Sequence, residues 1–107
     1  MKAFGKKFDE RLQVDRPFLN VDYEQLTEEE RSQFELMCQE ICAHIPEKIK
    51  EFEKKYMEKF EALKEAEEEE QFLAITDEMN ELSSIICDLN LLFLYIEGTY
   101  IAKSFHA

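Results

Sequence analysis

The last third of the chain carries one continuous pattern of apolar residues. The positions recur in alternating steps of three and four, at Phe72, Ile75, Met79, Leu82, Ile86, Leu89, Phe93, Ile96 and Tyr100. Residues three and four apart lie on one side of an α-helix. The second half has further apolar residues off this line, so most of its circumference needs cover. The pattern predicts a helix over 72–103 that the rest of the chain, or a second copy, covers.

A second apolar line runs from Phe34 to Leu63 and keeps its helical phase through Pro46. Thr27 is the predicted helix start, because its hydroxyl can cap a free N–H while Glu30 reaches back. A proline inside a helix removes a backbone hydrogen bond and clashes with the preceding turn. We therefore expect two segments, 28–44 and 46–69, that share one apolar face. One bent helix is the alternative.

The glutamate run at 65–70 is the predicted turn between the last two helices, because like charges are unfavourable at the negative end of a helix. The terminal helix should then run antiparallel to the preceding one. The whole chain is predicted to be a single domain, residues 1–107, with a helical core over 27–107.

The first 26 residues form the least regular part of the chain. Phe4, Phe8 and Leu12 lie four residues apart, which would suit a short amphipathic helix, whereas Pro17 and the residues after it show no helical period. A solvated tail would not normally hold so many large apolar groups. We expect this arm to lie across the helices and to cover part of the terminal one. A partner-binding arm is the alternative.

Together these patterns predict an all-α fold. Only two Gly and two Pro occur in 107 residues, and good helix formers dominate. The expected architecture is an antiparallel three-helix bundle with a kink or break at Pro46. The N-terminal arm would add a short fourth helix at most.

The net charge of −12 is unevenly distributed, since the first 21 residues are slightly basic and the rest is strongly acidic. Such a chain should repel nucleic acid directly and favour basic protein partners. Solubility alone is the other explanation of the acidic surface. Two clusters of glutamates are candidates for partner binding. The first consists of Glu28, Glu29 and Glu30, and the second of Glu67, Glu68, Glu69 and Glu70. A sharp bend at Pro46 would bring them to one end of the bundle, where they would resemble a row of phosphates.

Self-association is a second candidate activity. Four large apolar residues lie off the main line of the terminal helix: Leu91, Leu94, Tyr95 and Ile101. A homodimer would bury them symmetrically.

A metal site is a weaker candidate. Cys38, Cys42 and His44 bring two thiols and an imidazole together, but no CxxC pair or Glu-x-x-His pair of the known metal sites is present. All three cysteines are expected to be buried hydrophobes in a reducing compartment, with no metal and no cofactor. The apolar stretch from Leu89 to Ile96 is too short to cross a bilayer, so a cytoplasmic location without membrane contact is expected.

Catalysis is not expected, because the chain has no glycine-rich phosphate loop and no nucleophile elbow. The predicted function is that of a small acidic, non-enzymatic protein–protein interaction protein, either a binder of the immunity, antitoxin or inhibitor kind or a self-associating bundle. One alternative is an acidic mimic of nucleic acid that inhibits a DNA- or RNA-handling protein. The other is a small metal-binding bundle.

Overall fold

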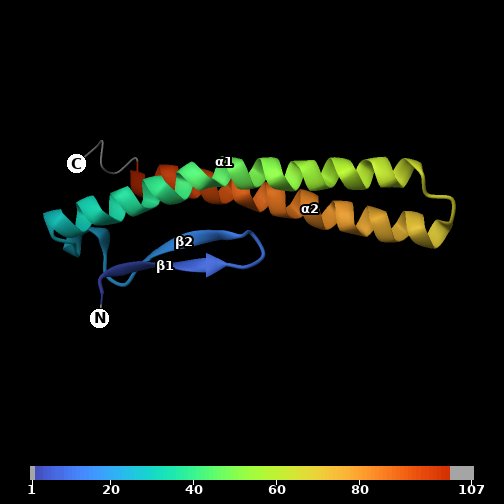
Figure 1. Cartoon of the computed structure of the whole chain (residues 1–107). Helices are drawn as coiled ribbons and strands as arrows, with labels where there is room; N and C mark the ends of the chain where they lie inside the picture. Colours follow the sequence, from blue (N-terminus) through green and yellow to red (C-terminus); the bar gives the residue numbers. More distant parts are fainter. Residues whose placement is uncertain (1, 102–107) are drawn as a thin grey trace.

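The computed structural model describes residues 2–101 as two long antiparallel helices with a β-hairpin packed on one end (Figure 1). In chain order the elements are β1 (Phe4–Asp9), β2 (Val14–Leu19), the short 3-10 helix η1 (Tyr23–Gln25), α1 (Glu28–Lys64), α2 (Glu69–Ile96) and a π-helical end, η2 (Glu97–Ile101). The chain is mainly helical, but the predicted all-α fold is wrong, because residues 2–101 also contain a two-stranded sheet. The three-helix bundle is wrong, because the described residues form two helices and a two-stranded antiparallel sheet.

Helix α1 runs without a break through Pro46, which corrects the predicted division into two segments. Figure 1 shows only a slight bend in its green part. Pro46 is exposed and borders a hollow between α1 and α2, so its ring is not part of the packed core. The apolar line on both sides of Pro46 contacts the same partner helix, and this shared face outweighs the local cost of one proline.

Replacing Pro46 by alanine is expected to stabilise the protein. The substitution restores an N–H donor for the carbonyl of Cys42 and relieves the ring clash, which should raise the free energy of unfolding by roughly 1–3 kcal/mol. Urea denaturation followed by circular dichroism measures the change. A loss of stability would show that the bend at Pro46 is needed for helix packing.

The N-terminal arm is a β-hairpin, not a short helix. Phe4 pairs with Leu19 and Asp9 with Val14 in an antiparallel register. A spacing of four residues places side chains on one face of a strand as well as of a helix, so the spacing of Phe4 and Phe8 did not distinguish the two. In the loop, the Asp9 carboxylate accepts a hydrogen bond from the backbone N–H of Leu12 at 2.9 Å.

The hairpin is part of the hydrophobic core. Leu12 is fully buried and Val14 is 5% exposed, and both belong to the same cluster as Phe34 on α1 and Leu89 on α2. The predicted role of the arm as a cover for part of the terminal helix is therefore confirmed, although its secondary structure differs.

Arg11, in the hairpin loop, joins the hairpin to α2 through three side chains. Its guanidinium donates to Asp88 at 2.7 Å, to the Ser84 hydroxyl at 2.8 Å and to Glu81 at 3.1 Å. These three residues are spaced by three and four, so they lie on one side of α2. That side therefore faces the hairpin.

The start of α1 forms as the sequence predicts, whereas its end at Lys64 comes five residues before the predicted 69. Thr27 accepts a hydrogen bond from the Glu30 N–H at 3.1 Å, and the Glu30 carboxylate accepts one from the Thr27 N–H at 2.9 Å. The helix ends at Lys64, and α2 begins at Glu69. The predicted capping box and the turn within the glutamate run are both confirmed.

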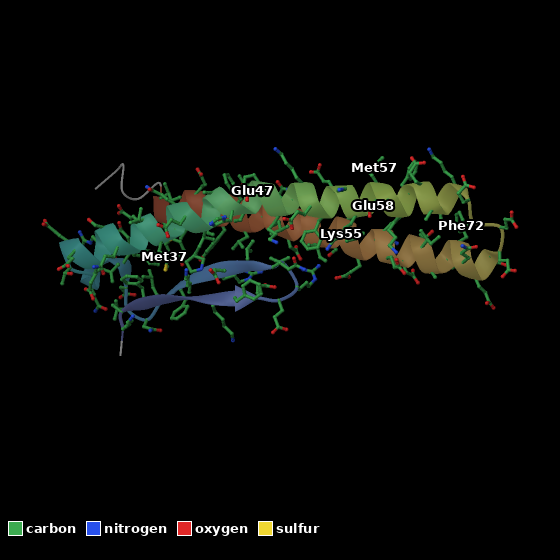
Figure 2. The ribbon with its side chains drawn as sticks, viewed as in Figure 1. Met37, Glu47, Lys55, Met57, Glu58 and Phe72 are labelled. Carbon is green, nitrogen blue, oxygen red and sulfur yellow. The ribbon has the colours of Figure 1, made fainter. Side chains whose placement is uncertain are left out.

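Beyond the hairpin loop, α1 and α2 continue as a bare pair of helices. Figure 2 shows Lys55, Met57 and Glu58 past the loop, with Phe72 farther toward the turn. An ion pair between Lys59 and Glu78 joins the two helices there. The predicted end of the terminal helix at Lys103 falls outside the described residues.

Candidate interaction surface

The acidic side chains in the body of α2 lie on the side that faces the hairpin and α1. Arg11 binds Glu81 and Asp88, and Lys59 binds Glu78. Asp77 is four residues before Glu81 and so shares its side of the helix. The remaining circumference of α2 between Gln71 and Ile96 carries no charged residue.

An exposed, mainly apolar stripe borders this acidic side of α2, since Leu91 and Tyr95 follow Asp88 by three and seven residues. It consists of Ser84, Cys87, Leu91, Leu94, Tyr95 and Gly98, and is called the α2 stripe below. Leu91 is 58% exposed, Leu94 65% and Tyr95 56%. Large apolar groups that lie this close together on a soluble surface mark an interaction site more often than single ones do. The structure therefore brings together three of the four residues predicted for self-association.

The fourth predicted residue, Ile101, is less exposed than these three. It is half-buried, packs against the hydrophobic core and lines a shallow hollow of about 360 Å³ between α1 and α2, together with Phe93 and Pro46. Its place beside the core follows from the π-helical geometry of Glu97–Ile101, which changes the side-chain directions expected for a regular α-helix. Ile101 is therefore at the margin of the α2 stripe.

Aromatic rings hold the C-terminal end of α2 in place beneath the stripe. The Tyr100 ring lies 4.9 Å from that of Phe34 and 5.8 Å from that of Tyr95, both edge-on. Phe4 of β1 contacts the other side of Phe34 at 5.4 Å. Edge-to-face pairs of this kind stabilise beyond their buried area. The exposed Tyr95 thus stands on a rigid base.

The two acidic groups predicted to meet at one end lie at opposite ends of α1. Glu28–Glu30 occupy its first turn, and Glu67–Glu70 form the turn and the start of α2. Because α1 has 37 residues and does not fold back at Pro46, its ends are about 55 Å apart at 1.5 Å per residue. The expected joint acidic field is therefore wrong, and Glu30 is engaged in the helix cap.

The cysteine and histidine candidates do not converge. Cys38 and Cys42 are buried, whereas His44 is exposed. Burial raises the pKa of the Cys38 thiol to about 12 and that of Cys42 to about 11, so both thiols favour the protonated form. Residues 2–101 contain no group of three or more His, Cys, Asp or Glu side chains placed to hold a metal ion.

Cys87 departs from the prediction that all three cysteines are buried, because it is exposed on the α2 stripe. It follows Ile86 directly and so points about 100° away from the apolar line. In dilute native protein, we expect one thiol per chain to react rapidly with a thiol reagent and two to react only after unfolding. The Cys87→Ser variant should lose the rapid phase. Rapid reaction of two thiols in that variant would contradict the packing of Cys38 and Cys42.

Stability should fall at alkaline pH. Burial raises the pKa of the Tyr23 and Tyr100 hydroxyls from 10.0 to about 12, with the Glu35 carboxylate, an acceptor of the Tyr23 O–H at 2.6 Å, as a further cause for Tyr23. An acid whose pKa is higher in the folded state stabilises that state below its unfolded pKa and loses this effect as pH rises. The melting temperature should therefore fall progressively above pH 10.0. The Tyr23→Phe variant should show a smaller decrease, and an unchanged melting temperature up to pH 12 would contradict the burial of both rings.

A second surface feature is a groove between the hairpin and α1. It has a volume of about 240 Å³ and is lined by Lys6 and Phe8 from β1 and by Met37, Ile41 and His44 from α1, among others. Figure 2 shows Met37 on the side of α1 that faces the strands. The sequence did not reveal this groove, because it exists only once the hairpin is packed on α1. Its lining combines acidic, basic and apolar groups without an arrangement that indicates one reaction.

The continuous helical segment Glu69–Ile101 has 33 residues and includes an 18-residue window with a mean hydropathy of 1.3, so it is long and apolar enough to cross a membrane by length and composition alone. Core helices of soluble proteins meet the same two criteria when they are mostly buried. Here only 28% of the apolar window is buried inside the chain. The most apolar segment of the chain thus has much of its surface uncovered by the rest of the chain.

Comparisons with models of protein families, with curated proteins and with solved structures find no match for this chain. The site must therefore be interpreted from its own geometry.

Proposed function

We propose that the protein is a non-enzymatic interaction protein that binds another polypeptide through the α2 stripe. The observation that carries the proposal is the distribution of charge. In a chain with 36% charged residues, the most exposed large apolar side chains of α2 lie together, with carboxylates only at the edges of the stripe: Asp88, which is paired with Arg11 at 2.7 Å, and Glu97. Interfaces are distinguished by this depletion of charge at their centre and by aromatic residues such as Tyr95.

The rigid helical support of the stripe also favours binding. Leu91, Leu94 and Tyr95 project from a regular helix, and Tyr95 rests on the buried Tyr100. Side chains on a rigid helix lose little conformational freedom when they bind, which leaves more of the apolar burial as affinity. Gly98 at one end is small and would let a partner helix approach closely, whereas Ser84 at the other end is bound by Arg11.

The two alternative functions have less support. Mimicry of nucleic acid would need the acidic groups to form one continuous field, whereas they lie at opposite ends of α1. A thiol-based metal site would need ionised sulfur, whereas burial raises the pKa of both Cys38 and Cys42.

The test is a comparison of capture by matched variants. Leu94→Glu places a charge on the stripe, and Leu36→Glu places one on α1 at a similarly exposed leucine, since Leu36 is 57% exposed. Polypeptides that bind wild type and Leu36→Glu but not Leu94→Glu would support the proposal. If every polypeptide that binds the wild type also binds Leu94→Glu, including a second copy of the chain, the stripe is not the binding surface.

A further inference from the structure

We propose that the polypeptide bound by the α2 stripe is a second copy of this chain, packed antiparallel so that α1 and α2 of both copies form a four-helix bundle with one β-hairpin on each outer side. This inference rests on the proposed function and names its partner.

The shape of the chain supports a second copy. Its accessible surface is 7516 Å², whereas a compact monomer of this length exposes about 6,300 Å². The radius of gyration is 18.3 Å, against about 13 Å for a compact domain of the same length. The excess surface of roughly 1,200 Å² is larger than the about 800 Å² that each partner contributes to a standard interface. One chain therefore has the area that a stable dimer needs.

The charge distribution also favours a second copy over a membrane surface. Two chains of net charge −12 repel one another, but the stripe itself holds no carboxylate, and Asp88 beside it is paired with Arg11 at 2.7 Å. Helices that lie on membranes typically carry Lys and Arg on their polar face. The segment from Glu69 to Ile101 contains neither residue, and its acidic groups would be repelled by anionic lipids.

Electrostatics selects the antiparallel orientation. In a parallel pair, the two turns at Glu65–Glu70, each with five glutamates, would lie side by side at one end of the dimer. Like charges at close range are unfavourable. In an antiparallel pair, the two acidic turns lie at opposite ends, and the helix dipoles of the two α2 helices oppose each other.

The stripe also sets the register. The contact that buries the most exposed residues places Leu91 opposite the partner's Leu94, and Leu94 opposite the partner's Leu91. The same register places Cys87 opposite the partner's Gly98. A Cβ added at Gly98 meets no atom within 4 Å in the single chain, so a side chain there would project freely toward the partner.

Disulfide cross-linking tests both the partner and its orientation. With Gly98→Cys, Cys87 of each copy lies opposite the new thiol of the other, so mild oxidation should give roughly tenfold more covalent dimer than in wild type. Wild type should cross-link poorly, because its two Cys87 thiols are about 17 Å apart along the helix in this register. Adding Cys87→Ser to Gly98→Cys is the control and should abolish the gain.

Each outcome has a distinct meaning. Efficient cross-linking of the wild type through Cys87 would place the two Cys87 residues opposite each other and overturn the proposed arrangement of the two copies. No cross-linking of any variant, with a monomer mass in light scattering, would overturn the second copy as partner. The proposed function would still stand if the wild type captured a polypeptide that Leu94→Glu does not capture. It would fail as well if both proteins captured the same polypeptides. Flotation of the protein with neutral or anionic lipid vesicles, lost in Leu94→Glu, would assign the stripe to a membrane and overturn the inference.

Discussion

Replacing Leu12 by alanine is expected to lower the free energy of unfolding by about 2–5 kcal/mol, the range for a fully buried leucine whose removal leaves a cavity. Leu12 has no exposed surface and lies in the hairpin loop, where it enters the core between α1 and α2. The loop is held by the bonds of Arg11 to α2 and by the Asp9 carboxylate, so it cannot easily move to fill the space.

Urea denaturation of Leu12→Ala against wild type measures this effect, and Leu36→Ala is the matched control. Leu36 is a leucine on the surface of α1, where a substitution should change stability by no more than about 0.5 kcal/mol. A change below 1 kcal/mol in Leu12→Ala, similar to the control, would show that the hairpin is a dispensable arm and would contradict its place in the core.

Leu94→Glu should weaken self-association at least about 100-fold, since a charge buried without a partner costs several kcal/mol. The two-fold symmetry doubles the effect, because each copy brings one carboxylate into the contact. Leu36→Glu, with the same chemical change outside the stripe, should leave the dimer intact. Light scattering after size exclusion measures both masses.

The fold of the monomer should survive the change at Leu94. The side chain is 65% exposed in the single chain, so a carboxylate there remains solvated, and circular dichroism should give the same helix content. A Leu94→Glu protein that stays dimeric would place the self-association surface elsewhere.

The helices could be predicted wherever short-range physics decides the structure. The capping box of Thr27 and Glu30, the apolar line of α2 and the acidic turn depend on residues a few positions apart. Pro46 shows the limit of this reasoning. The unbroken helical phase on both sides of it favours one helix, whereas the local penalty of a proline favours a break. The shared contact with α2 outweighs that penalty, and only the structure shows this contact.

The hairpin could not be predicted from the same patterns. A four-residue spacing such as that of Phe4 and Phe8 suits both helix and strand, and the decisive contacts of the hairpin are long-range. Arg11 binds residues 70 and 77 positions away in the sequence. Only these contacts show which side of α2 is covered and which is free.

The candidate surface was predictable in part. Leu91, Leu94 and Tyr95 were found because they lie off the apolar line of α2, and the structure leaves all three exposed. Cys87 was missed as a member of the stripe, because cysteine is usually a buried residue. Ile101 is half-buried beside the core, because residues Glu97–Ile101 form a π-helix in place of the regular helix that the sequence predicts.

Sedimentation equilibrium of the wild-type chain at two salt concentrations tests the central claim most directly. Raising the salt from about 0.1 M to about 1 M shortens the Debye length from about 10 Å to about 3 Å. If two acidic chains associate through an uncharged stripe, screening reduces their repulsion, and the dissociation constant of the dimer should fall. A dimer that weakens as salt is added, or a chain that remains monomeric at both concentrations, would contradict the account.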